Sequence, residues 1–219
     1  MKKIFDKHKT LWLQKSFLYA VFVGLVLLVI SLFATYYANF YTAIHASNPV
    51  TDILLDNLPV VNVDFIFNEG PFIFIAILTI ILLYEPRRIP FVLKSSALFT
   101  IVRAFFLTLT HIAPPLRQSY IDPTDILYVI SSGNDLFFSA HTGLPFMLAI
   151  TFWEEKYLRY FFLVMTVIGG AAVIFGHLHY SIDVFSALFI AFGIFHIAKV
   201  FFSRDYETMR TEPAIESNG

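Results

Sequence analysis

Long apolar blocks separated by short charged turns dominate this chain of 219 residues and restrict its fold more than any other feature. Hydrophobic residues make up 58% of the sequence and charged residues only 14%. A soluble domain of this length carries about a quarter of its residues as charged ones. The sequence therefore predicts an all-α, polytopic membrane helix bundle.

Six of the apolar blocks are candidates for helices that cross a bilayer, which takes about twenty apolar residues. We expect these helices at residues 16–39, 66–84, 90–113, 139–153, 157–176 and 180–202. No small-residue cleavage site follows the first block, so we expect that helix to be retained. The expected organisation is a basic N-terminal segment (1–15), a six-span membrane catalytic domain (16–202) and a polar tail (203–219).

The positions of the basic residues predict how these helices are oriented. In a six-span arrangement, thirteen of the 15 Lys and Arg residues fall on the side that carries both termini. Basic residues are enriched in the cytoplasmic loops of membrane proteins. Both termini are therefore expected in the cytoplasm, and loops 40–65, 114–138 and 177–179 are expected outside. The short chain and brief loops favour a bacterial inner membrane.

Two polar clusters begin the fourth and the sixth expected helices. Ser139 and His141 begin the fourth, and His179 and Asp183 begin the sixth. Two spans separate the clusters, so both are expected at the same outer surface. His179 and Asp183 are four residues apart and share a helix face, where a carboxylate can fix the imidazole tautomer. This pattern favours an oriented nucleophile or base, with His141 as a proton donor.

The fourth helix also begins in a way that suits an anion. Ser139 is a favourable N-cap residue, and the free N–H groups of the first turn, near Thr142, attract a group such as phosphate. Pro145 removes the backbone donor to the carbonyl of His141. An alternative stays open, in which the histidines are ordinary interfacial residues and the acid only complements the helix dipole.

Three further residues are candidates for binding the substrate. Arg103 lies near the middle of an apolar span, where a cation is costly and usually functional. We expect it to face the bundle and to pair with a polar group, such as Asp183, or with a bound phosphate; a purely structural role is the alternative. Leu107 and His111 follow on the same expected helix face. Asp135, in an acidic outer loop, is a candidate for contacting a cationic head group.

Two motifs resemble those of a known enzyme family. The stretch "NDLFFSAHT" resembles the GD-x-LFSGHT motif of the sphingomyelin synthase family, and "HLHYSIDV" resembles its H-x-HYTIDV motif. That family belongs to the lipid phosphate phosphatase (phosphatidic acid phosphatase type 2) superfamily. "EPRRIPFVLKSSALFTIVRAFFLTLTHIAPP" resembles the family's third-span motif, and "DNLPVV" resembles its first-loop PLPD element. The resemblance covers residues 56 to 202, including the six-span layout.

The resemblance implies a two-step phosphoryl transfer through a phosphohistidine. Carried over by position, His179 attacks phosphorus while Asp183 orients it. His141 protonates the departing diacylglycerol oxygen and then takes a proton from the acceptor, a ceramide-like alcohol or water. The implied partners are membrane phospholipid and lipid alcohol substrates in the bilayer.

The chain departs from the family motifs at three positions. Ala140 replaces a Gly, Leu178 replaces an acidic residue, and Ser181 replaces a Thr. None of these changes removes a reacting group.

Charge favours transfer over monoester hydrolysis. The phosphatase branch of the superfamily has a Lys-x6-Arg-Pro motif and an Arg six residues before the nucleophile, whereas this chain has neither and carries Val173 at the second position. A phosphate monoester carries close to two negative charges, and a diester carries one. We therefore expect a phospholipid diester donor, with a lipid phosphate monoester phosphatase as the alternative.

Two other classes of function, a transporter or scaffold and a metal site, have less support in the sequence. A non-catalytic transporter or scaffold stays open, although no repeat relates the two halves of the chain as in many transporters. His177, His179 and Asp183 could form a metal-ligand set, but a helix start favours an anion, so no metal is expected. Without cysteines, thiol chemistry is excluded. No cofactor or nucleic-acid partner is indicated, and a homo-oligomer is possible.

Overall fold

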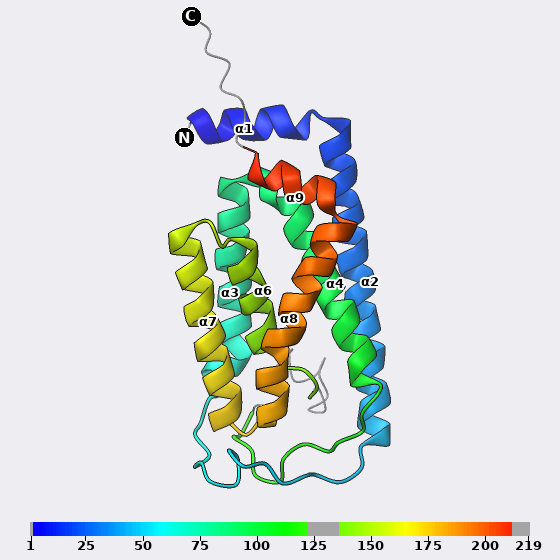
Figure 1. Cartoon of the computed structure of the whole chain (residues 1–219), viewed down its shortest axis with the longest axis vertical. Coiled ribbons are helices and arrows are strands. Elements are labelled where there is room, and N and C mark those ends of the chain that lie inside the picture. Colours follow the sequence, from blue (N-terminus) through cyan, green and yellow to red (C-terminus); the bar gives the residue numbers. More distant parts are fainter. Residues whose placement is uncertain (1, 122–135, 212–219) are drawn as a thin grey trace, which may run out of the picture.

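The computed structural model describes residues 2–121 and 136–211, and every regular element in these ranges is a helix. The helices are α1 (Lys2–Trp12), α2 (Lys15–His45), α3 (Asp64–Tyr84), the 3-10 helix η1 (Pro86–Arg88), α4 (Ile89–Leu107), α6 (Ala140–Thr151), α7 (Lys156–Phe175), α8 (Ser181–Phe201) and α9 (Ser203–Arg210). Helices α2 to α8 form an elongated bundle, and α1 and α9 lie across one end of it (Figure 1). The all-α prediction is confirmed for the described residues.

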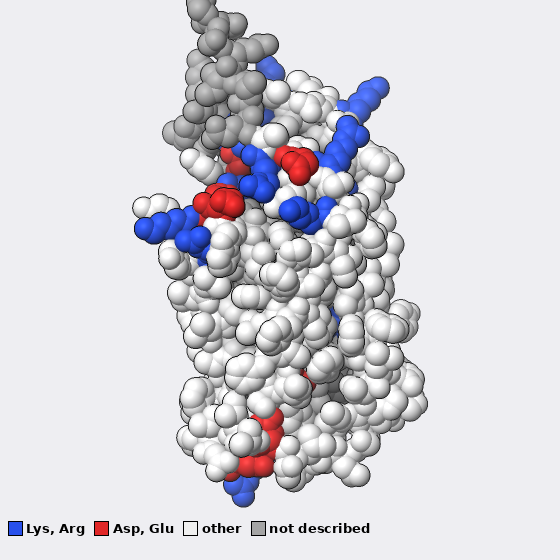
Figure 2. Space-filling view, in the orientation of Figure 1, with Lys and Arg blue, Asp and Glu red and all other residues white. Residues whose placement is uncertain are grey.

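We call the end of the bundle that carries α1, η1 and α9 the terminal end, and the opposite end the loop end. The loop end carries residues 46–63 and 108–121 (Figure 1). On the face shown in Figure 2, Lys and Arg side chains gather mainly at the terminal end, and a long uncharged belt separates them from the loop end. The charge asymmetry that the sequence predicts is therefore a feature of the folded chain.

Five described helical segments are long and apolar enough to cross a membrane: α2, α3, η1 with α4, α7 and α8. The fourth expected span is shorter, because α6 has 12 residues and extends only about 18 Å, against about 30 Å for a bilayer core. The chain reaches α6 through a non-helical segment, Leu136–Ser139, in which Leu136, Phe138 and Ser139 are buried. Non-helical backbone is tolerated at membrane depth only where protein surrounds it.

The third expected span also ends earlier than the sequence predicts. Helix α4 stops at Leu107 rather than at residue 113. Beyond it the chain turns toward the loop that follows α2, where the backbone N–H of Ser47 donates to the carbonyl of His111 at 2.7 Å. The prediction that His111 shares a helix face with Arg103 is therefore wrong, because this loop pairing replaces the last helical turn.

Helix α8 packs into the bundle through small residues. Ala187, Ala191 and Ala198 are fully buried against α4 and α6. Across from α8, Gly143 of α6 lies so close to Phe99 that an added Cβ would come within 2.9 Å of the ring. Small residues allow this close approach. The van der Waals contacts that result hold helices together in lipid, where the hydrophobic effect does not act between them.

Two prolines each remove one helical hydrogen bond next to His141. Proline has no N–H, so Pro71 in α3 leaves the carbonyl of Phe67 without its helical donor, and Pro145 in α6 does the same to the carbonyl of His141. The Nε2 atom of His141 lies 3.3 Å from the Phe67 oxygen. The carbonyl of His141 lies against Gly169 of α7, where a Cβ would stand 2.2 Å from the oxygen.

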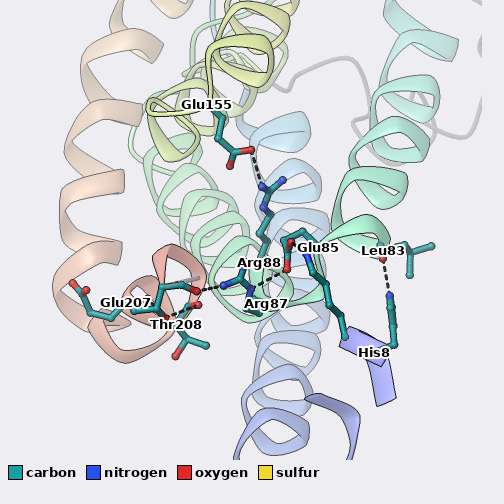
Figure 3. A network of polar contacts seen from close by, with 10 residues as sticks. His8, Leu83, Glu85, Arg87, Arg88, Glu155, Glu207 and Thr208 are labelled. Atoms are coloured by element: carbon teal, nitrogen blue, oxygen red, sulfur yellow. Dashed lines mark hydrogen bonds and ion pairs between the residues drawn. The ribbon is translucent and has the colours of Figure 1, made fainter. Parts of the chain in front are cut away.

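Ion pairs join the elements of the terminal end (Figure 3). Glu85 accepts hydrogen bonds from Lys7 of α1 and from Arg87 Nε at 2.8 Å, and Arg88 pairs with Glu155 at 2.7 Å. Burial raises the pKa of the Glu85 carboxyl, but its hydrogen bonds to Arg87 and Lys7 outweigh that effect and hold the pKa below its ordinary value. The paired arginines of the "EPRRIP" turn thus link helices at the end opposite the start of α8.

At the loop end, one carboxylate joins the loop after α2 to the start of α8. Asp52 accepts from the backbone N–H of Ser181 at 2.7 Å, and also from those of Leu54 at 2.9 Å and Leu55 at 3.2 Å. Burial raises the pKa of Asp52, but a hydrogen bond to the Ser181 side chain, together with these backbone bonds, outweighs that effect, so the pKa falls below its ordinary value of 3.8. The charged form of Asp52 is therefore the one that holds the loop on α8.

We expect Gly169→Ala to separate α6 from α7 and to displace His141. The added methyl group meets a backbone oxygen, which has no rotamer through which to move away, and overpacking of this kind costs about 1–3 kcal/mol or more. Gly193→Ala in α8 is the matched control, because nothing lies within 4 Å of its added Cβ. Thermal unfolding of both variants in detergent measures the difference, and equal midpoints would contradict the close contact at Gly169.

We expect Asp52 to make the stability of the loop end depend on pH. Because its pKa is lowered on folding, its stabilising effect is complete above the ordinary value of 3.8 and is lost as the pH falls through the lower folded value. Asp52→Asn should lower the free energy of unfolding at neutral pH by about 1–2 kcal/mol. It should also make the fall in stability below pH 4 less steep than in the wild-type chain. Thermal midpoints measured against pH provide the test. Glu207→Gln, at the terminal end, should leave the pH profile unchanged.

Candidate active site

His179 and Asp183 form a buried pair at the start of α8. Their side chains are each 4% exposed, and His179 Nδ1 lies 3.4 Å from Asp183 Oδ2. The same carboxylate oxygen accepts the backbone N–H of Tyr180 at 3.0 Å, so Asp183 also caps the helix. At 3.4 Å the pair is within ion-pair range, and His179 Nδ1 makes no hydrogen bond within the described chain. Catalytic contacts are often this long before a substrate binds.

Because Asp183 faces Nδ1, the other ring nitrogen of His179 is the one that can act on a substrate. A carboxylate beside Nδ1 fixes the proton there and leaves Nε2 with its lone pair. The structure thus brings these two residues together. It also places Asp183 in the first turn of α8, where its charge complements the helix dipole as in the alternative interpretation.

The first turn of α6 lies directly beside this pair. Ser139 is the N-cap residue of α6, and its backbone N–H donates to the carbonyl of Asp183 at 3.0 Å. Its hydroxyl makes no capping bond and instead accepts from Thr142 Oγ1 at 3.3 Å. The positive end of the α6 dipole therefore meets the start of α8, as expected for a site that attracts an anion.

His141 occupies the second position of α6 and lines a large cavity inside the bundle. Its ring stacks on Phe67 with the ring centroids 4.6 Å apart. A carbonyl oxygen can only accept, so the contact to the Phe67 oxygen places the hydrogen on His141 Nε2. In the neutral ring Nδ1 is then the basic nitrogen, and in the charged ring both nitrogens donate.

The cavity beside His141 has a volume of about 300 Å³ and is lined almost entirely by apolar side chains. Helices α2, α3, α4, α6 and α7 all contribute to its wall. Among its described lining residues, Arg103 is the sole Lys or Arg. Arg103 is 4% exposed, and its Nε donates to the carbonyl of Phe138 at 2.6 Å. It therefore faces the bundle, as predicted, and binds the segment that leads into α6.

Asp183 contacts a second, much smaller cavity of about 10 Å³, lined also by Thr42, Thr110 and Tyr180. That volume matches roughly one water molecule. His141 thus lines the large cavity while Asp183 lines the small one, and neither His179 nor Asp183 is part of the large cavity's wall.

The backbones of the two histidines nevertheless converge on one helix. The carbonyl of His141 lies against Gly169, and the backbone N–H of His179 donates to the carbonyl of Val173 at 3.3 Å. Gly169 and Val173 are four residues apart on α7, which is about 6 Å along the helix axis. Together with the contact between Ser139 and Asp183, this spacing makes the two histidine clusters neighbours.

Other predicted site residues lie apart from this centre. The ring of His111 contacts those of Tyr41 and His45 at the loop end in tilted arrangements, with ring centroids 5.5 and 5.6 Å away. Asp135 lies outside the described residues. His177, considered as a metal ligand, is buried in a left-handed backbone conformation with a φ of 54°. In the part of the chain that the structure describes, no three metal-binding side chains gather into a site.

Helix α2 carries a polar face that was not among the predictions from the sequence. Thr35 and Asn39 of α2 line the large cavity, and Asn39 is fully buried. With Ser31 and Thr42 they recur at steps of three or four residues, the spacing of one helix face. That spacing was readable in the sequence, but four polar residues in a strongly apolar block do not lower its hydropathy enough to stand out. Asp52 carried no comparable signal.

This arrangement suits acid–base chemistry on an anionic group at a helix start. It provides a carboxylate-oriented imidazole, a second imidazole whose tautomer is fixed by a carbonyl, and a buried guanidinium that lines the same cavity as the second imidazole. The adjoining apolar cavity would suit the hydrocarbon part of a ligand.

Residues 132–200 match the family model described as PAP2 superfamily C-terminal. The match includes α6, α7 and most of α8, and with them His141, His179 and Asp183. No curated protein and no solved structure is significantly similar to the chain. The match supports placing the chain in the PAP2, or lipid phosphate phosphatase, superfamily, and with it a membrane enzyme of the phosphatase or phosphotransferase class.

Proposed function

We propose that this protein is an integral-membrane phospholipid head-group phosphotransferase, similar to sphingomyelin synthases. It moves a phosphodiester head group from a glycerophospholipid to a ceramide-like alcohol or to water. The observation that carries the proposal is the buried His179–Asp183 pair, whose backbone contacts α7 one turn from that of His141. One phosphoryl group bound at the start of α6 would lie between the two imidazoles.

In the first step, Nε2 of His179 attacks phosphorus and forms a P–N bond. The P–O bond to diacylglycerol breaks, and the leaving oxygen takes a proton from Nδ1 of the charged His141 ring. Asp183 stabilises the positive charge that develops on the His179 imidazole. Arg103 and the N-terminal dipole of α6 offset the negative charge on the phosphoryl oxygens.

In the second step, His141 is neutral and its Nδ1 accepts a proton from the acceptor hydroxyl. The acceptor oxygen attacks phosphorus, the P–N bond breaks, and His179 is restored. A ceramide-like alcohol gives head-group transfer, whereas water gives phospholipase C-like hydrolysis. Both steps use the same two histidines in opposite proton-transfer roles.

The charge near the site favours a diester donor. A monoester brings close to two negative charges at neutral pH, while Arg103 is the one guanidinium or ammonium group among the described residues of the cavity wall. A diester carries one negative charge, which a single cation balances. A lipid phosphate monoester phosphatase remains the second candidate function, because it needs the same histidines and the same family match.

We further propose that α6 and the buried segment before it complete a sixth crossing, so that both termini lie in the cytoplasm. Three observations support this topology: α1 and α9 share one end of the bundle (Figure 1), the basic residues gather there (Figure 2), and Arg103 binds the carbonyl of Phe138. The candidate site would then act on the non-cytoplasmic leaflet, which is the periplasmic leaflet of a bacterial inner membrane.

We expect His179→Ala to abolish turnover and Asp183→Asn to reduce it by about a hundredfold or more, because general acid–base groups and their orienting partners contribute about 10²–10⁴ in rate. His196→Ala is the matched control on the same helix: His196 is exposed and bonds only the carbonyl of Phe192 in the described chain. The assay supplies defined phospholipids with and without ceramide and identifies the products by mass spectrometry.

Two outcomes of that assay would contradict the proposal in different ways. Consumption of phosphatidic acid alone, with release of free phosphate, would favour the phosphatase. Full turnover by the His179→Ala variant would exclude His179 as the nucleophile.

We also expect a covalent phosphohistidine on His179 during turnover. Donor lipid labelled with ³²P should transfer its head-group phosphate to the protein when no acceptor alcohol is present, giving a label that is released by acid and stable to base. The label should be absent from the His179→Ala variant and present in the His196→Ala variant. Labelling of the His179→Ala variant would show that another residue forms the intermediate.

A further inference from the structure

The large cavity opens sideways toward the region that lipid would occupy. Four of its lining residues have strongly exposed side chains: Leu32 of α2 is 57% exposed, Ile66 and Ile75 of α3 are 41% and 55% exposed, and Ile168 of α7 is 41% exposed. All four belong to helices that are long and apolar enough to span a membrane. The mouth of the cavity therefore borders α2, α3 and α7 and faces hydrocarbon rather than water.

The inner wall of this cavity is not purely apolar. Asn39 is fully buried and Arg103 is 4% exposed, and both line the cavity together with Thr35. Polar groups in a hydrocarbon environment are costly unless they are hydrogen-bonded. An occupant that carries hydrogen-bonding atoms as well as chains therefore matches the polarity of this wall better than a plain acyl chain does.

Among the described residues, the hydroxyl of Thr35 lacks the backbone hydrogen bond that most threonines in apolar helices make. A threonine in an apolar helix usually donates to the carbonyl four residues earlier. Five do so here: Thr42, Thr79, Thr100, Thr151 and Thr166. The hydroxyl of Thr35 is shielded from solvent and has no hydrogen-bond partner within the described chain. A helical threonine has two accessible χ1 rotamers, so this hydroxyl can turn toward the cavity without moving the backbone.

We propose that this cavity binds a two-chain membrane lipid and that Thr35 donates a hydrogen bond to a carbonyl oxygen of the lipid's linkage, either an ester or an amide. The inference deepens the proposed function, because it places the lipid phosphate near His141. Thr35 lies one helical turn from Asn39 toward the terminal end, about 6 Å deeper in the bundle. In a phospholipid the linkage carbonyl groups likewise lie deeper in the membrane than the phosphate. A lipid whose carbonyl group reaches Thr35 would therefore hold its phosphate nearer the loop end.

Thr35 is then a positioning residue rather than a catalytic one. Its bond to the linkage would fix how far the lipid enters the cavity, and so where its phosphorus lies relative to the start of α6. The chains would leave through the mouth, which is lined by Leu32, Ile66, Ile75 and Ile168 and is suited to hydrocarbon of any length.

The test measures lipid binding directly, so that it does not depend on turnover. The purified full chain in detergent receives an equimolar mixture of a diacyl phosphatidylethanolamine and its dialkyl ether analogue with chains of the same length, and native mass spectrometry gives the ratio of the two complexes. A second arm compares a ceramide with its carbonyl-free N-alkyl analogue. The first arm tests the ester carbonyl and the second the amide carbonyl.

We expect the wild-type chain to prefer the carbonyl-bearing lipid by about fivefold in at least one arm, as for the loss of one buried hydrogen bond. Thr35→Val is nearly isosteric and should abolish the preference, whereas Thr35→Ser should retain it. Thr79→Val is the matched control, because Thr79 is exposed on α3 and outside the cavity wall. It should behave as wild type.

Three results would overturn the inference: no lipid complex, no preference in the wild-type chain, or an unchanged preference in Thr35→Val. If Thr35→Val does not fold, Thr35→Ala replaces it with the same expected loss. A preference that depends on Thr35 in a protein that turns over none of these lipids would support this site and contradict the proposed transferase. Turnover of these lipids without a preference for the carbonyl-bearing lipid would support the proposed transferase and contradict this site.

Discussion

The need to satisfy backbone polar groups without water constrains this bundle more than any other requirement. The chain enters α6 through a buried, non-helical segment, and irregular backbone at membrane depth must find its partners in the protein. Arg103 supplies one by donating to the Phe138 carbonyl, and Asp183 supplies another through its own carbonyl, which accepts from Ser139. Arg103 and Asp183, which the sequence predicts as site residues, therefore also hold in place the segment that leads into α6.

The same constraint explains why the prolines lie beside His141. Each proline removes the helical donor of one carbonyl oxygen. One of these oxygens lies next to the imidazole of His141, and the other belongs to His141 itself and lies against Gly169. The irregular backbone thus fixes both the ring and the main chain of the candidate proton carrier, which is how a side chain on a short helix becomes precisely oriented.

The parts of the fold set by local patterns could be predicted from the sequence, and the parts set by long-range contacts could not. Apolar blocks gave the helices, and spacing paired His179 with Asp183. The end of α4 was predicted too far along, because the bond between Ser47 and His111 joins residues 64 positions apart in the sequence. Helix α6 (Ala140–Thr151) lies within the expected range of 139–153, but the buried non-helical segment before it was not predicted, because the contact from Arg103 that holds it joins residues 35 positions apart in the sequence.

The motifs that resemble those of the sphingomyelin synthase family do not all lie at the candidate site. Its two histidine motifs fall at neighbouring helix starts, beside a cavity, within the stretch that matches the PAP2 superfamily. The paired arginines of the third-span motif instead bind Glu85, Glu155 and the Thr211 carbonyl at the opposite end (Figure 3). A guanidinium committed to such an ion pair is not available to a phosphate at the loop end. The bundle thus separates its charges by role, with ion pairs joining helices at one end and Arg103 buried in the cavity wall that it shares with His141.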